Sequence, residues 1–220
     1  MGFERFAFHF PASAEILGYP IAGAGNDLRV GKRRYNWVWY RKTSEVELED
    51  MLTDDSGYHH PMGIPPALIR GDVVARMRAA SEITVSPPLR HVLHRIERPF
   101  FTPIYDLLSP QFAFGRVALI GDAAVVARPH VGYGTTKAAG DALSLARAVG
   151  NGSGDLAAAL THYHSDRYDL GERCFYRGQQ LGAWISGAPP RTDRERGEYA
   201  ELHSTAGILR HVASGEFLRM

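Results

Sequence analysis

Residues 115–149 read GRVALIGDAAVVARPHVGYGTTKAAGDALSLARAV, and this stretch decides the fold. The apolar run at residues 117–120 predicts a fully buried β-strand that ends at Gly121 and Asp122. A Gly-rich loop follows, and then an Ala- and Leu-rich helix that ends at Gly150. The order strand, loop and helix predicts an α/β unit in which a ligand binds at the carboxyl end of the strand.

The turn and the loop contain the residue types that a ligand site needs. Gly121 allows a tight turn and a close approach, and the Asp122 carboxylate can accept hydrogen bonds from ligand hydroxyls. Thr135 and Thr136 are candidate caps of the helix, whose first turn offers free N–H groups and the positive end of the helix dipole. These groups favour an anion or an electron-rich carbonyl. The alternative is a strand, loop and helix that bind nothing, and the added presence of Pro129 and of an aspartate in the helix argues against it.

Composition places this segment in an ordinary globular chain. The 220 residues are 45% hydrophobic and 22% charged, and 25 Lys and Arg against 24 Asp and Glu leave a net charge of +1. This balance gives no electrostatic reason to expect nucleic acid or an anionic membrane as a partner. No apolar run reaches the roughly 18 residues that span a bilayer, and the N-terminus does not resemble a secretory signal. The single cysteine, Cys174, favours a reducing, cytoplasmic location.

The flanking regions divide the chain into three expected parts. Residues 1–105 contain alternating and aromatic-rich segments, such as FERFAFHF and RRYNWVWYR, and predict a partial β-rich, substrate-binding-like domain. Residues 106–150 hold the strand, the loop and the helix. Residues 151–220 predict a helical region that follows a short NGSG hinge. We therefore expect an α/β (α+β) chain.

Local patterns predict the individual elements. Ser44 and Glu47 have the capping-box spacing at the start of SEVELEDMLT. The segments 99–108 and 114–124 are expected as two strands. Besides the helix of the 115–149 stretch, the expected helices are 44–53, 67–80, a shorter helix or extended segment over 87–99, a long helix from Asp155 to about Ile185, and a final helix over 198–213.

Residues 127–142, ARPHVGYGTTKAAGDA, together with the preceding GDAA, resemble a known motif. They are similar to the C-terminal flavin-binding motif of the class A flavin-dependent aromatic hydroxylases, the para-hydroxybenzoate hydroxylase superfamily. The 2,6-dihydroxypyridine 3-monooxygenase branch is the most similar, and ILGYPIAG, RRYNWVWYR and PFFTPIYDLLSPQFAFGRV fit it too. The resemblance covers most of residues 6–186. It implies the C-terminal portion of that fold, with residues 106–150 as the FAD-binding segment.

The resemblance also implies a function, which is hydroxylation of a hydroxylated aromatic or N-heteroaromatic ring, such as a dihydroxypyridine. In this family NAD(P)H reduces FAD, oxygen adds at the flavin C4a atom, and the hydroperoxide transfers a hydroxyl to the ring. Asp122 would bind the ribityl chain, and the helix start would stabilise negative charge at the flavin N1–C2=O edge. His130 is the candidate catalytic residue, which would contact or deprotonate a ring hydroxyl, although it could equally only pack or bind the backbone. The implied FAD-binding residues are Gly121, Asp122, Ala123, Pro129, Gly132, Gly134, Thr135 and Thr136.

One departure from the family is plain. A complete member begins with a strand, a GxGxxG loop and a helix that bind the ADP half of FAD, and this sequence has no such motif. The nearest match, GAGNDL at 23–28, lacks the third glycine and predicts a hairpin turn instead. Two alternatives therefore stay open: a truncated non-catalytic remnant or binding module, and a half-enzyme that needs a partner chain carrying GxGxxG. A homodimer is a further candidate assembly, because a missing N-terminal half leaves a sheet edge exposed. No metal site is expected, since His91, His94 and Glu97 match no zinc motif.

Overall fold

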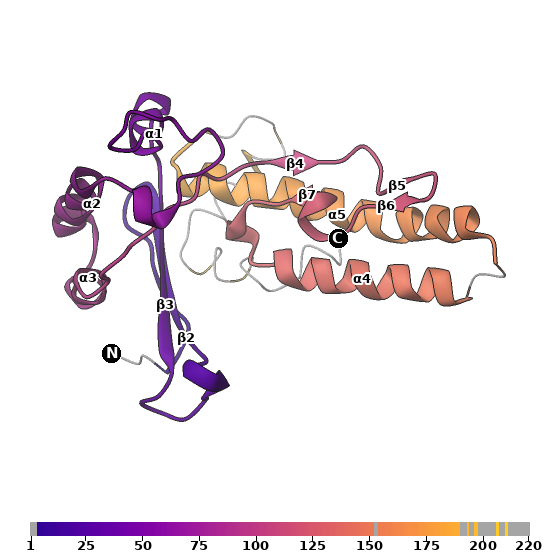
Figure 1. Cartoon of the computed structure of the whole chain (residues 1–220), viewed down its shortest axis with the longest axis horizontal. Helices are drawn as coiled ribbons and strands as arrows, with labels where there is room; N and C mark the ends of the chain where they lie inside the picture. Colours follow the sequence, from indigo (N-terminus) through magenta and orange to yellow (C-terminus); the bar gives the residue numbers. More distant parts are fainter. Residues whose placement is uncertain are drawn as a thin grey trace. The chain divides into compact units, whose positions relative to one another are not determined.

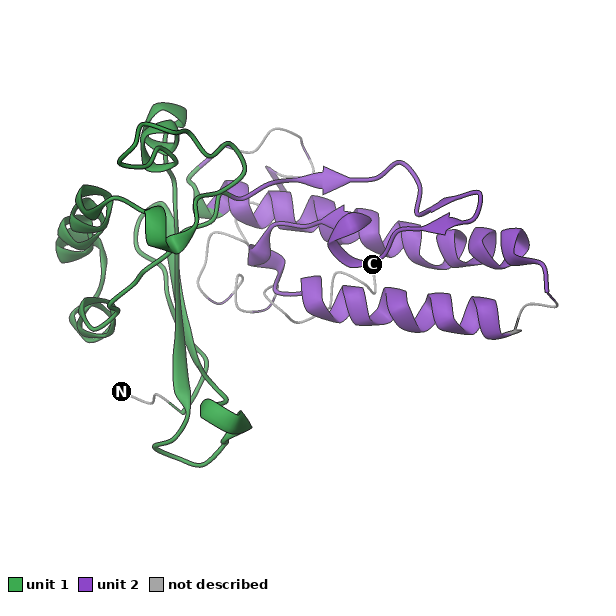
Figure 2. Cartoon of the chain, in the orientation of Figure 1, with its two compact units in different colours: residues 1–103, 185–187 green, residues 104–184, 188–220 purple. Residues whose placement is uncertain are grey.

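The computed structural model describes residues 4–151 and 154–189, together with residues 193, 196, 197, 206 and 210. The chain divides into two compact units, shown in green and purple in Figure 2. Unit 1 comprises residues 1–103 and 185–187, and unit 2 comprises residues 104–184 and 188–220. None of the described helices is both long and apolar enough to cross a membrane.

Unit 1 is built on an antiparallel sheet of three strands in the order β1-β2-β3 (Figure 1). Its strands are β1 (Ala7–His9), β2 (Ala14–Ile21) and β3 (Arg34–Arg41), joined between β2 and β3 by the short 3-10 helix η1 (Ala24–Asn26). The β-rich start of the chain and the turn at the GAGNDL match are therefore as predicted. Ile16 on β2 packs against Val85 and Leu89, which fixes which face of β2 meets the helices.

The helices of unit 1 follow the sheet. They are α1 (Glu45–Met51), η2 (Pro66–Leu68), α2 (Gly71–Thr84) and α3 (Pro87–His94). Ser44 caps α1 as predicted, because its hydroxyl accepts a hydrogen bond from the Glu47 N–H at 3.1 Å. Residues 87–99 were predicted as either a short helix or an extended segment. They form the helix α3 as far as His94, with prolines in its first turn.

Unit 2 consists of short strands, two 3-10 turns and two long helices that lie side by side in Figure 1. Two antiparallel pairs join β4 (Leu107–Leu108) to β7 (Val125–Val126) and β5 (Ala113–Phe114) to β6 (Val117–Ala118). The turns are η3 (Gly121–Ala123) and η4 (Pro129–Val131). The helices are α4 (Gly134–Asn151) and α5 (Leu156–Ile185), close to the predicted bounds.

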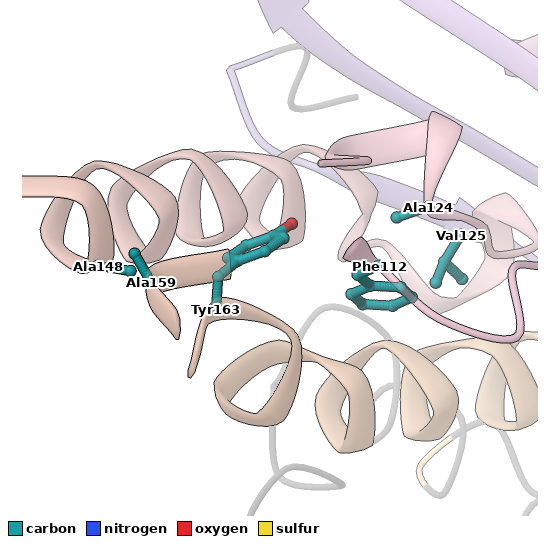
Figure 3. Packing of buried hydrophobic residues seen from close by; sticks show 6 residues of the cluster. All are labelled: Phe112, Ala124, Val125, Ala148, Ala159 and Tyr163. Atoms are coloured by element: carbon teal, nitrogen blue, oxygen red, sulfur yellow. The ribbon is translucent and has the colours of Figure 1, made fainter. Parts of the chain in front are cut away.

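The core of unit 2 forms where the helices meet the strands and loops (Figure 3). The Tyr163 ring on α5 is fully buried, and its hydroxyl donates to the Leu119 carbonyl at 2.7 Å. Helix α5 accepts this packing through glycines. A side chain at Gly171 would meet the Phe112 ring at 2.6 Å, and one at Gly178 would meet the Arg128 backbone at 2.9 Å. The buried cluster is Phe112, Ala124, Val125, Ala148, Ala159 and Tyr163.

The prediction of a fully buried strand at residues 117–120 is wrong. Only two of these residues form a strand, β6, and it pairs antiparallel with β5. Val117 is 58% exposed and Ile120 is 40% exposed. Among the described residues β6 belongs to a sheet of two strands, so it is not the central, covered strand that the apolar run predicted.

Two predictions lie wholly or partly outside the described residues. The final helix expected over 198–213 is described only at residues 206 and 210, and the NGSG hinge lacks residues 152 and 153.

Candidate functional site

The GDA turn, η3, depends on a backbone conformation that favours glycine. Gly121 has φ +58°, and a Cβ atom there would lie 3.3 Å from the Cβ of Ala138 on α4. A side chain is therefore disfavoured both by the backbone and by the close approach of the helix. The next residue, Asp122, is exposed, and no described residue forms a hydrogen bond or ion pair with its carboxylate. The turn thus presents a free acceptor at its surface.

A buried cluster of charges holds this turn. Asp141 on α4 has no exposed surface, and its Oδ2 accepts the Gly121 N–H at 3.1 Å and the Lys137 ammonium at 2.7 Å. The Lys137 Nζ also donates to the Gly121 carbonyl at 3.0 Å, so both polar groups of Gly121 are fixed. Arg167 on α5, whose side chain is 14% exposed, donates from Nε to Asp141 Oδ1 at 2.9 Å. We call Lys137, Asp141 and Arg167 the buried triad.

Sequence reasoning noted an aspartate in the helix but missed its partners. Lys137 and Asp141 are spaced i, i+4 in an Ala-rich helix, which is a recognised signal for an ion pair on one helix face. Their burial at 1% and 0% exposure could not be read from that spacing. Arg167 lies 26 residues beyond Asp141, and no local pattern links the two.

The start of α4 differs from the prediction. The Tyr133 carbonyl accepts the Lys137 N–H at 2.8 Å, so the helix begins at Gly134. Thr135 and Thr136 therefore lie inside the first turn and are not caps, contrary to the expectation. Both side chains are exposed, and the space over Gly134 is open. The first N–H groups of α4 have no partner within the helix and remain available to a ligand.

The Pro129 loop is held from two sides. Gly132 has φ +61° and donates its N–H to the Pro129 carbonyl at 2.8 Å, which closes η4. Arg128 forms a salt bridge with Asp106, with 2.7 Å between Nη2 and Oδ2. The Gln179 side chain on α5 donates to the same carboxylate oxygen at 3.2 Å. The loop is thus joined by a salt bridge to Asp106, which in turn accepts a hydrogen bond from α5.

His130 is buried, with 5% of its surface exposed. Burial first and then the positive charge of Arg128 lower its pKa from 6.5 to about 4, although Asp106 acts in the opposite direction. The ring is therefore neutral at pH 7. A Cβ atom at Gly182 on α5 would lie 3.1 Å from the Nδ1 of His130, so the ring packs closely against this glycine. A role for His130 as a proton acceptor stays a prediction.

A second notable carboxylate lies in unit 1. Glu15 on β2 has no exposed surface, and neither of its oxygens has a hydrogen-bond partner among the described residues. Burial raises its pKa from 4.5 to about 7. Sequence reasoning missed Glu15, although a charged residue inside the apolar strand AEILGYPI was a visible signal.

A cavity of about 740 Å³ lies between α4 and α5. It contains none of the residues predicted to bind a cofactor. Its lining includes Arg147, Asp155, His162 and Asp166.

Comparison with known proteins gives a consistent set of relatives. The family described as FAD binding domain-like matches residues 3–106, so this match lies in the region of unit 1 and ends before the GDA turn. The 2,6-dihydroxypyridine 3-monooxygenase of Paenarthrobacter nicotinovorans is 28% identical over 169 residues, which is 76% of this chain and 41% of the relative. Salicylate hydroxylase of Pseudomonas putida is 40% identical over 78 residues, 34% of this chain and 18% of the relative.

The solved structures agree with the sequence relatives. The structure of 2,6-dihydroxypyridine-3-hydroxylase from Arthrobacter nicotinovorans matches with a TM-score of 0.75 and 26% identity, covering 84% of this chain and 46% of that one. The chain thus spans less than half the length of the curated relatives it matches.

Proposed function

We propose that this chain, a homologue of the FAD-dependent aromatic hydroxylases, binds FAD at the GDA turn and the Pro129 loop and contributes to hydroxylation of an aromatic ring. The resemblance to these enzymes is shown by their sequences and by their shared fold. The substrate we favour is a hydroxylated aromatic or N-heteroaromatic ring of the dihydroxypyridine kind. NAD(P)H is the proposed reductant.

The observation that carries the proposal is the free acceptor at Asp122 on a turn whose backbone is fixed. The buried triad holds both polar groups of Gly121, so Asp122 projects from a rigid support. A ribityl chain has several hydroxyl donors, and an exposed carboxylate on a rigid turn suits them. The residues present therefore fit the polar part of FAD.

The start of α4 supports the same cofactor. Its free N–H groups and the positive end of its dipole suit the carbonyl edge of a flavin, which becomes negative on reduction. We place Gly134, Thr135 and Thr136 at this edge, with Pro129 and Gly132 along the ring and Gly121 and Ala123 near the ribityl and pyrophosphate part. FAD supplies the oxygen-transfer chemistry when bound. The chain supplies position and a helix dipole.

We propose His130 as a residue beside the ring site. With a pKa of about 4 it is neutral at pH 7, so it can accept a hydrogen bond from a ring hydroxyl without carrying charge. Substituting His130 with Gln keeps an acceptor but removes the imidazole, and it separates these two contributions.

The test of FAD binding is a titration of FAD fluorescence with the whole chain and with Asp122→Ala. We expect the variant to bind FAD roughly tenfold or more weakly, because a charge-assisted hydrogen bond is lost. FAD should also raise the melting temperature of the wild-type chain but not that of the variant. Asp55→Ala is the control, since it removes an exposed aspartate from unit 1. Equal affinity in all three proteins would remove Asp122 from the site.

One observation favours a second arrangement, in which polypeptide outside residues 1–220 completes the FAD site. Val117 and Ile120 at the strand, and Leu143 and Val149 on α4, are exposed although they are apolar. Contiguous exposed apolar patches mark interaction sites, and we propose that these four side chains belong to one such patch. We propose that it packs against a nucleotide-binding domain of the GxGxxG type.

The probe for this arrangement is the part of the Paenarthrobacter 2,6-dihydroxypyridine 3-monooxygenase that this chain does not match. Light scattering after size-exclusion chromatography should detect a complex with this chain, and FAD should bind the mixture more tightly than either part. Leu143→Glu should prevent the complex, whereas Leu68→Glu, at an exposed leucine of unit 1, should not. Failure to associate, or equal association of both variants, would refute the arrangement.

A further inference from the structure

Glu15 poses a physical problem that the proposed function does not solve. Its carboxylate is fully buried, and no described residue donates a hydrogen bond to either oxygen. Burying a carboxylate without donors is strongly unfavourable, and buried polar groups in native proteins are nearly always paired. A group in this position therefore calls for a partner that is not part of the described chain.

The strand register places Glu15 on a defined face of the sheet. Side chains alternate along β2, so Glu15, Leu17 and Tyr19 share one face, while Ile16 packs on the opposite face against Val85 and Leu89. Glu15 pairs with Tyr40 on β3. Glu15 therefore points away from the side of the sheet on which Ile16 packs.

The same face is rich in aromatic rings. Phe8 pairs with Leu17 across the strands, and its ring stacks on those of Phe6 and Phe10, with centroids 4.8 Å and 5.8 Å away. Tyr19 stacks on Phe6 at 4.6 Å. We call this surface the aromatic face, defined by Phe6, Phe8, Phe10, Tyr19 and Tyr40 around Glu15.

The chemistry of the aromatic face is selective. Stacked rings bind another planar ring by offset or edge contacts. A carboxylate accepts hydrogen bonds and has two oxygens, so it suits two donors side by side, such as a ring hydroxyl next to a protonated ring nitrogen. A ring that itself carries a carboxylate would place two negative charges together, which is unfavourable.

We infer that Glu15 is the acceptor of a ring-binding site on the aromatic face, which takes a planar ring bearing O–H or N–H donors and rejects a ring bearing a carboxylate. This inference rests on the proposed function, because it names the recognition element for the substrate class proposed above. Glu15 and Tyr40 are cross-strand partners. Burial first, and then the negative charge of Glu15, raise the pKa of Tyr40 to about 12.

The test is calorimetric titration of the whole chain with two probes, without FAD and at pH 8, where Glu15 with its pKa of about 7 is ionised. The first is 2,6-dihydroxypyridine, which carries donors and no carboxylate, and the second is salicylate, which carries a carboxylate. The proteins are the wild type, Glu15→Gln, Glu15→Leu, and the control Glu49→Gln, which changes an exposed glutamate of α1 in the same unit.

We expect the wild type and Glu49→Gln to bind 2,6-dihydroxypyridine and to bind salicylate weakly. Both Glu15 variants should bind 2,6-dihydroxypyridine roughly tenfold to a hundredfold more weakly, while their affinity for salicylate stays equal or increases. Their melting temperatures should stay equal or rise, because an unpaired buried carboxylate has been removed. A residue with only a structural role would give parallel losses for both probes together with a lower melting temperature.

The inference is overturned if the wild type fails to bind 2,6-dihydroxypyridine at millimolar concentration, or if the Glu15 variants bind both probes as the wild type does. Should neither variant fold, NMR of the isotope-labelled wild type decides, since the Glu15 carboxyl resonance must shift when 2,6-dihydroxypyridine is added, and an unmoved resonance refutes the site. Because these titrations contain no FAD, their outcome is separate from that of the FAD titration with Asp122→Ala.

Discussion

Unit 1 and unit 2 each bury a carboxylate completely, and they treat it in opposite ways. Asp141 of unit 2 accepts hydrogen bonds from Lys137, Arg167 and the Gly121 N–H. Glu15 of unit 1 has no donor among the described residues. Equal burial therefore describes two different situations. Asp141 stabilises a turn, whereas Glu15 is held at an energetic cost that a binding role would explain.

The largest effect is expected from breaking the paired case. Asp141→Ala leaves Lys137 and Arg167 without their counter-charge and leaves the Gly121 N–H without its acceptor. We therefore expect a loss of about 3–5 kcal/mol in the free energy of unfolding. Urea unfolding followed by far-UV circular dichroism, to which the long helices α4 and α5 of unit 2 contribute strongly, measures it.

The control replaces the whole triad with apolar residues, as Lys137→Met, Asp141→Leu and Arg167→Met together. Replacing a buried ion cluster in this way is often neutral or stabilising. A triple variant less stable than Asp141→Ala would show that the triad contributes more than charge pairing.

Replacing the unpaired carboxylate of Glu15 should raise the free energy of unfolding, whereas replacing Asp141 should lower it. The pKa of Glu15 is raised in the folded chain to about 7 from 4.5, so its contribution to stability is present below pH 4.5 and is lost as the pH rises through 7. Glu15→Gln should therefore be more stable than the wild type by up to about 3 kcal/mol at pH 8, and the gain should shrink toward pH 4.5. Urea unfolding at pH 5 and pH 8 tests this, and a variant that is less stable at pH 8 would contradict it.

His130 should make the stability of unit 2 fall as the pH is lowered, whereas Glu15 makes the stability of unit 1 fall as the pH is raised. Its folded pKa of about 4 lies below the ordinary 6.5, so its contribution is present above pH 6.5 and is lost as the pH falls through 4. Between pH 7 and pH 4 we expect the wild type to lose about 3 kcal/mol more than His130→Gln does. Unfolding curves at the two pH values measure the difference, and equal losses would mean that the histidine titrates normally.

A small, exposed interaction sets the scale for these effects. Ser44→Ala removes the hydroxyl that caps α1 and should lower the free energy of unfolding by about 1 kcal/mol. Ser44→Gly should lower it by only a few tenths. If Ser44→Ala lowered the free energy of unfolding as much as Asp141→Ala, the difference in burial between these two hydrogen-bonded groups would not determine their contribution to stability.

Elements with strong local patterns were predictable from the sequence. The alternating strands of unit 1 and the periodic α5 lie close to where they were expected. Ser44 could be assigned because a cap depends on residues three positions apart. The prediction that Thr135 and Thr136 cap α4 failed because the helix begins one residue earlier, directly after Tyr133. The residue at which a helix begins depends on backbone geometry, which composition does not encode.

The candidate site was predictable in its turn and loop but not in its support. The bonds from Arg167 to Asp141 and from Arg128 to Asp106 join residues more than 20 positions apart. The buried-strand prediction failed for a related reason, since an apolar run implies burial only where another element covers it. Charge burial at Glu15 and the lowered pKa of His130 likewise come from tertiary surroundings.

The glycines of α5 have a consequence for how unit 2 forms. Each glycine inside a helix makes helix formation less favourable by about 1 kcal/mol relative to alanine. An isolated peptide with the sequence of α5 should therefore have low helicity around Gly171 and Gly178. In the protein those positions lie directly beneath Phe112 and Arg128, and a bulkier residue would push this segment away. The middle of α5 and the segment from Phe112 to Arg128 should therefore order in a single cooperative step, and their amide protons should exchange with solvent at matching rates.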